Sequence, residues 1–99
     1  MHPNLNAVYV PSDKIVAREI EGELVIVPLV SGIGDMEDEL FTLNETGKAM
    51  WSKMDGKNNL AKIVDELAKE YESPREEIKN DVLGLAKELI KRGMLAEAA

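Results

Sequence analysis

Hydrophobic residues form short, dense runs in the first half of the chain and recur at helical spacing in the second half. Two runs, 15–20 and 23–29, are rich in β-branched and aliphatic residues. Glu21-Gly22 separates them, and a two-residue spacing with glycine second is typical of a tight hairpin turn. After a loop with two glycines, a third run begins at 39 and ends at 43. The pattern predicts three antiparallel strands at these positions.

Amphipathic segments at about 45–55, 60–71 and 74–91 follow the third run. Each has a polar residue suited to cap its start: Asn44, then Asn58 or Asn59, then Ser73. Ser73 precedes Pro74 and Glu76, so the third start has the pattern of a capping box. Glycine follows the first helix at 56 and the third at 93. The sequence therefore predicts an α+β fold, a three-stranded antiparallel sheet followed by three helices.

Gly47 is unusual because glycine inside a helix costs about 1 kcal/mol relative to alanine. Either another group approaches the backbone closely at this position, or an exposed first turn tolerates the glycine.

The two ends of the chain differ from its middle. Residues 1–13, rich in proline, asparagine and other polar residues, are expected to form an arm, in which 8–10 adds a short edge strand or covers the core. A single domain is expected over 14–95, with Met94 packing back on it, and a frayed tail over 96–99.

Composition excludes several classes of function. The 99 residues suffice for one domain, and 44% of them are hydrophobic. The absence of cysteine excludes disulfides and thiolate chemistry, and no run is apolar enough to span a membrane, so a cytoplasmic protein is expected. Twelve basic against nineteen acidic residues give a net charge of −7, which disfavours nucleic-acid binding.

No catalytic, metal or cofactor site is predicted. The single histidine, His2, lies in the arm without an evident partner, so an enzyme is not expected. The acidic residues of the 30–38 loop lack the spacing of an EF-hand loop, and the other acids are spread over wet helix faces.

The third helix carries two neighbouring apolar rows. The row that is expected to face the core comprises Ile78, Val82, Leu85 and Leu89. The second row comprises Lys79, Leu83, Ala86 and Ile90, with Lys87 at its polar margin. This second row either widens the core contact or remains available to a partner.

An exposed sheet edge beside the second row would suit a peptide. The third strand is one of the candidate edges, and its backbone could pair with an extended peptide by β-augmentation. We therefore predict that the backbone of Leu40, Phe41, Thr42 and Leu43 binds a peptide strand. Apolar peptide side chains would contact Leu83, Ala86 and Ile90, and Lys79 and Lys87 would favour acidic peptides.

Three segments carry a resemblance to a known family: LNETGKAMW, IVDELAKEY and IKRGML. Together with the third strand and Asp55-Gly56, they resemble the PqqD family, the small proteins similar to pyrroloquinoline quinone synthesis protein D, and the resemblance covers about 8–95. It implies a winged-helix-like fold that acts as the leader-recognition element of pathways for ribosomally made, modified peptides. It also implies that the leader of a precursor peptide adds as a strand between the third strand and the third helix. A non-catalytic adaptor, or peptide chaperone, of this kind presents the leader to a radical SAM or other modifying enzyme and needs no cofactor.

Two other functions remain as alternatives. A winged helix could bind DNA, but the start of the third helix offers one cation, Arg75, beside Glu76 and Glu77. The open strand could also pair with its own copy and form a homodimer.

Overall fold

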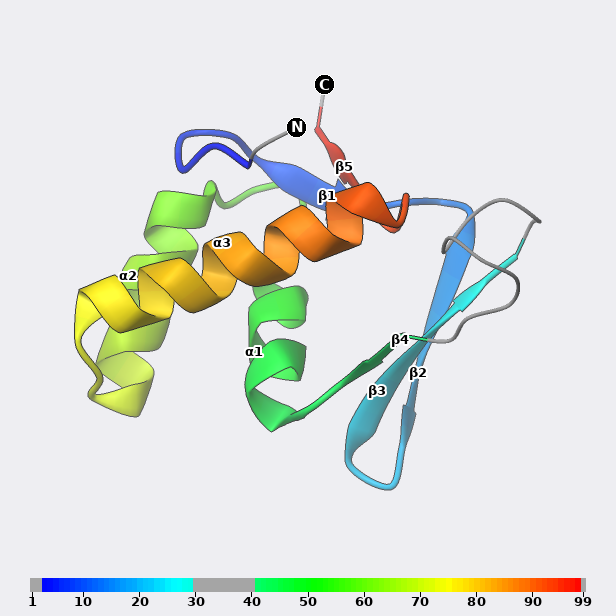
Figure 1. The fold of residues 1–99 in the computed structure, drawn as a ribbon, viewed down its shortest axis with the longest axis horizontal. Helices are drawn as coiled ribbons and strands as arrows, with labels where there is room; N and C mark the ends of the chain where they lie inside the picture. Colours follow the sequence, from blue (N-terminus) through cyan, green and yellow to red (C-terminus); the bar gives the residue numbers. More distant parts are fainter. Residues whose placement is uncertain (1–2, 30–40, 99) are drawn as a thin grey trace.

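A three-stranded antiparallel sheet lies to one side of three helices in the computed structural model, which describes residues 3–29 and 41–98 (Figure 1). Its strands are β2 (Ile15–Ile20), β3 (Glu23–Pro28) and β4 (Phe41–Leu43), in the order β2-β3-β4. This confirms the predicted sheet. Residues 39 and 40, the predicted start of the third strand, lie outside the described part of the chain, as does the acidic loop.

The turn between β2 and β3 has the predicted two residues. Glu21 and Gly22 both have positive φ, 52° and 86°. A tight hairpin turn with both central residues in this region matches the twist of the strands, and glycine adopts it without strain. Glutamate does so at a cost, so the register of the hairpin rather than the preference of Glu21 determines the turn.

The three helices are α1 (Glu45–Lys53), α2 (Leu60–Tyr71) and α3 (Arg75–Lys91). The predicted caps of the first two are confirmed. Asn44 Oδ1 accepts a hydrogen bond from Gly47 N at 2.8 Å, and Asn59 Oδ1 accepts one from Lys62 N at 2.8 Å. Each side chain satisfies a backbone donor that has no partner within its helix.

The predicted cap of α3 is wrong. Ser73 Oγ donates to the carbonyl of Tyr71 at 3.3 Å and makes no cap to the helix. Pro74 is the N-cap, with an extended ψ of 136°, and its carbonyl accepts from the backbone N–H of Ile78. Glu76 forms an ion pair with Lys79 within the helix instead of completing a capping box.

Gly47 is explained by a close approach. A Cβ at this position would lie 3.3 Å from Asn44 Oδ1 and 3.3 Å from two side-chain atoms of Leu43. Gly47 is also buried. Of the two explanations offered by the sequence, the structure therefore favours crowding over a tolerated exposed position.

One core joins the sheet to the helices. Val82 and Leu89, from the row of α3 predicted to face the core, are fully buried, as are Ile63 and Leu67 of α2. Phe41 and Trp51 are partly buried and pack against the same cluster. Hydrophobic burial of this kind is the main stabilising term of a small domain.

The ends of the chain form a second, two-stranded sheet that was not predicted in full. β1 (Tyr9–Pro11) pairs antiparallel with β5 (Leu95–Glu97), and the two strands lie side by side in Figure 1. The predicted frayed tail over 96–99 is therefore wrong for the residues that β5 includes. The predicted packing of Met94 against the body is confirmed, since that side chain is fully buried.

The N-terminal arm belongs to the fold. The carbonyls of Leu5 and Ala7 accept hydrogen bonds from the start of α2, at Ala61 N and Leu60 N. Tyr9 is only 5% exposed and is part of the core. The predicted boundary at residue 13 therefore does not separate an arm from a domain, because the arm supplies core residues and hydrogen bonds.

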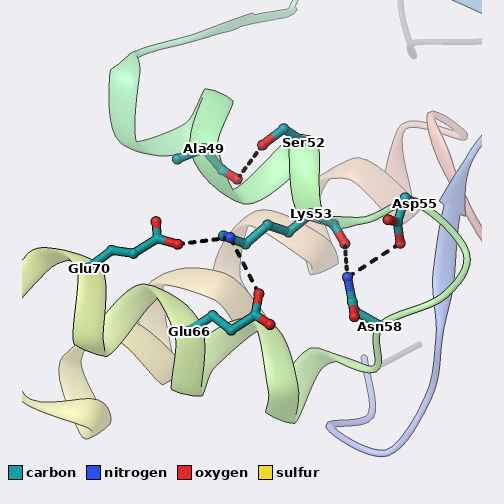
Figure 2. A network of polar contacts seen from close by, with 7 residues as sticks. All are labelled: Ala49, Ser52, Lys53, Asp55, Asn58, Glu66 and Glu70. Carbon is teal, nitrogen blue, oxygen red and sulfur yellow. Dashed lines mark hydrogen bonds and ion pairs between the residues drawn. The ribbon is translucent and has the colours of Figure 1, made fainter.

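Lys53 links α1 to α2 (Figure 2). Its Nζ lies 3.0 Å from Glu70 Oε2 and 3.3 Å from Glu66 Oε1. The hydrogen bond to Glu70 is the main reason that the pKa of Lys53 is raised above 10.5. None of the described helices is long and apolar enough to cross a membrane.

Lys53→Met is expected to lower the free energy of unfolding by about 1 kcal/mol at neutral pH and low salt, since half-exposed ion pairs contribute this much at most. A raised pKa means that the folded state holds the lysine proton more tightly than the unfolded state. The contribution is therefore full below the unfolded pKa and is lost as the pH rises through the folded pKa, above 10.5. Urea unfolding of both proteins from pH 7 upward measures this.

Lys62→Met, which changes an exposed lysine on α2, serves as the control. A Lys53→Met difference that persists unchanged at pH values well above 10.5 would contradict the role of the lysine charge.

Candidate functional site

β4 is an edge strand that leads directly into α1. Within residues 3–29 and 41–98, β3 is the strand that pairs with it, and no other described strand covers its outer side. Leu43 is buried, whereas Thr42 is exposed. Asn44, the cap of α1, follows at once, so the rigid start of a helix holds the end of this strand.

The sheet register shows which way the backbone groups of β4 point. A two-residue hairpin turn is closed by a hydrogen-bonded pair, here Ile20 with Glu23. Hydrogen-bonded and non-hydrogen-bonded pairs then alternate along the two strands. Val25 is therefore hydrogen-bonded to β2, and Pro28, which has no N–H, falls in a non-hydrogen-bonded pair. Val25 is the partner of Thr42 on β4. The N–H and C=O of Thr42 therefore point away from β3, toward the open edge.

A hollow of about 600 Å³ lies between this edge, the start of α1 and the middle of α3. We call it the β4–α3 groove. Its lining residues come from three parts of the chain: Glu23, Thr42, Leu43, Asn44, Thr46, Gly47, Met50, Asp81 and Leu85. Backbone donors and acceptors therefore stand beside a partly apolar depression.

One flank of α3 faces β4. Asp81 and Leu85, one helical turn apart, line the groove. Farther along the same flank, the Arg92 guanidinium carbon lies 4.6 Å from the centre of the Phe41 ring, in a cation–π contact. Arg92 Nε also donates to Glu88 Oε2 at 2.9 Å. The contact between Arg92 and Phe41 links the end of α3 to the beginning of β4.

The predicted peptide-binding residues divide between this site and other parts of the molecule. Thr42 and Leu43 line the groove, and Phe41 lies at its Arg92 end. Leu40 lies outside the described residues.

The second row of α3, predicted to contact a peptide beside β4, does not line the β4–α3 groove. Leu83 and Lys87 line a different hollow of about 240 Å³, together with Pro3 of the N-terminal segment. Ile90 and Lys79 occupy the same flank by helical position, and Lys79 is paired with Glu76 at 3.3 Å. By helical position, these residues lie on the flank of α3 opposite Asp81 and Leu85.

Ala86 is also placed differently. It is 0% exposed and belongs to the core, whereas Leu85, expected in the core, is partly exposed in the groove. On an ideal helix, Leu85 lies about 60° to one side of Val82 and Ala86 about 40° to the other. Hydrophobicity favours the leucine as the core residue, but the packing turns the alanine inward.

Sequence reasoning missed Asp81, Leu85 and Arg92 as site residues. Asp81 resembled any acid on a wet helix face, and Arg92 resembled a helix-ending cation. Their helical spacing from Leu85 shows that the three residues share one flank of α3. Only the position of β4 in the structure shows that this flank lines the site. Across the described part of the chain, no group of three or more His, Cys, Asp or Glu side chains is arranged to hold a metal ion.

Comparison with known families assigns the chain. The model of "Coenzyme PQQ synthesis protein D (PqqD)" matches residues 23–95, most of the sequence and all of the groove. The chain belongs to the PqqD family. No curated protein matches this PqqD-family chain.

Two solved structures have the same fold as this PqqD-family chain. One is described as "TbiB1 in Complex with the TbiA(beta) Leader Peptide", with a TM-score of 0.72, 26% identity, and coverage of 87% of this chain and 93% of the other. The second is "Lasso peptide synthetase B1 complexed with the leader peptide", with a TM-score of 0.77, 22% identity, and coverage of 91% and 99%. Both confirm the predicted fold, a three-stranded sheet followed by three helices.

Proposed function

We propose that this PqqD-family chain is a non-catalytic adaptor that captures the leader of a ribosomally made precursor peptide. The leader would add as a strand to the outer edge of β4 and be presented to a modifying enzyme of the radical SAM or another type. The observation that carries the proposal is the open edge at Thr42 beside the β4–α3 groove. The titles of both similar structures name a bound leader peptide, which supports the same role here.

Main-chain and side-chain contacts would both contribute to binding. Thr42 offers one N–H and one C=O to an added strand, enough to set its register but not its sequence. The side chains that flank this pairing on the peptide would point toward α3. There, Leu43, Met50 and Leu85 provide the apolar surface that gives affinity.

The contacts first predicted on α3 change in this proposal. Leu85 replaces Leu83 and Ile90 as the apolar contact, and Ala86 lies beneath the surface as part of the core. Lys87 lines the other hollow and Lys79 pairs with Glu76, so in this proposal neither of them selects an acidic leader.

DNA binding fits the structure less well. Arg75, the cation at the start of α3, is held at 2.6 Å by Asp65, and two glutamates follow it. With a net charge of −7, little positive potential faces a phosphate backbone.

Leu85→Gln is expected to weaken peptide binding about tenfold, because it removes an apolar contact of the groove and leaves the core in place. The probe is a fluorescently labelled peptide selected from a displayed library of random linear peptides against the whole chain. Fluorescence anisotropy gives the Kd, and circular dichroism checks the fold.

Leu83→Gln is the matched control, a partly exposed leucine on the opposite flank of the same helix. It should leave the Kd within about twofold of the wild type, since it touches no part of the groove. The opposite ranking of the two variants would move the peptide to the flank that was predicted from the sequence. Sedimentation that shows self-association through β4 instead of peptide binding would support the homodimer.

A further inference from the structure

The charged residues that line the β4–α3 groove have one sign. Of the described residues that line it, the charged ones are Glu23 at the start of β3 and Asp81 on α3. Both side chains are exposed to solvent. Arg92 lies at the far end, where it already contacts Phe41 and Glu88.

The register determines which side chain of an added strand meets these carboxylates. One residue of an added antiparallel strand is hydrogen-bonded to Thr42. The peptide residues on either side of it then lie opposite Phe41 and Leu43. Because paired residues in a sheet point to the same face, the residue opposite Leu43 has its side chain on the face of Leu43, which is the face of the groove. Asp81 and Leu85 of α3 lie across from it.

A long cationic side chain fits this position. Its methylene stem can lie on Leu43, Met50 and Leu85, while its charged end reaches Asp81 at the rim. Glu23 lies on the other face of the sheet, with Thr42, and adds negative potential without a direct contact. A short apolar residue would leave the carboxylates without a partner, and an acidic residue would be repelled by both.

The start of α1 opposes this preference but is the weaker influence. A helix N-terminus has about half a positive charge and favours anions. Here Asn44 already caps Gly47 N, and Glu45 in the first turn offsets the dipole. Two full negative charges at the rim therefore outweigh it.

We propose that the leader residue opposite Leu43 is lysine or arginine, so the groove selects leaders by a single cation rather than by an acidic sequence. This inference rests on the proposed function. It assigns Asp81 and Glu23 as specificity-determining residues.

The test measures the preference of the groove directly. Peptides selected from a displayed random library against the whole chain are expected to share a Lys or Arg at one aligned position. Replacing this residue by Gln in a synthetic, labelled peptide should weaken binding to the wild type about fivefold. The same replacement should have almost no effect on binding to the double variant Glu23→Gln/Asp81→Asn.

The control double variant Glu77→Gln/Glu97→Gln removes the same number of charges from exposed positions outside the groove. With this variant the fivefold effect should persist. Selected peptides without a shared cation, or an undiminished effect in Glu23→Gln/Asp81→Asn, would overturn the specificity but not the peptide-binding function. If the folded chain selects no peptide at all, the proposed function itself fails.

Discussion

Thr42→Pro is expected to weaken peptide binding strongly while the chain remains folded. The register directs the N–H of Thr42 to the open edge, so proline removes a donor that β3 does not use. The loss of this hydrogen bond and the bulk of the ring at the pairing edge should weaken binding by more than about tenfold. Anisotropy with the selected peptide measures the Kd, and thermal unfolding measures the fold.

Thr42→Val is the control, because it changes the side chain and keeps the backbone donor. It should bind as the wild type does. Phe41→Pro should instead destabilise the protein, since the backbone of Phe41 pairs with Ile26 of β3. Wild-type affinity in folded Thr42→Pro would mean that the peptide does not add to β4.

Ala86→Asp is expected to unfold the protein or lower its stability by on the order of 4 kcal/mol, because it puts an unpaired charge into the core. Ala86 is 0% exposed and belongs to the core cluster. For a domain of this size, such a loss should lower the melting temperature by more than about 15 °C. Differential scanning calorimetry and urea unfolding measure it.

Lys87→Asp introduces the same side chain at the next position of α3, which is exposed. Stability and peptide affinity should both stay near the wild-type values, because Lys87 contacts neither the core nor the groove. A stable Ala86→Asp protein would show that this face of α3 is not packed as described.

Features encoded by neighbouring residues were predictable from the sequence. The hairpin turn depends on a glycine that accepts positive φ, and the starts of α1 and α2 depend on an asparagine that bonds three residues ahead. The predicted cap at Ser73 was wrong, because its hydroxyl donates to the carbonyl of Tyr71, two residues earlier, instead of capping α3. A capping residue in the sequence therefore predicts a helix start only where no other hydrogen-bond partner competes for its side chain.

The candidate site was predictable in part. The strand that offers its edge was identified because it lies third in the sheet and leads directly into Asn44, the cap of α1. The flank of α3 that faces it was not, since Leu85 and Ala86 lie on either side of the core direction and their sequence pattern is nearly symmetric. Only the packing of the helix against the sheet and α2 decides its rotation.

The ladder between β1 and β5 has a consequence for biosynthesis. It joins Tyr9, near the beginning of the chain, to Glu97, near its end. Short-range elements such as the β2–β3 hairpin can form as soon as they leave the ribosome, but closing so large a loop must wait for β5 to emerge. The β1–β5 ladder therefore forms only after β5 has left the ribosome, and a nascent chain stalled before β5 exposes the core surface that Leu95 covers.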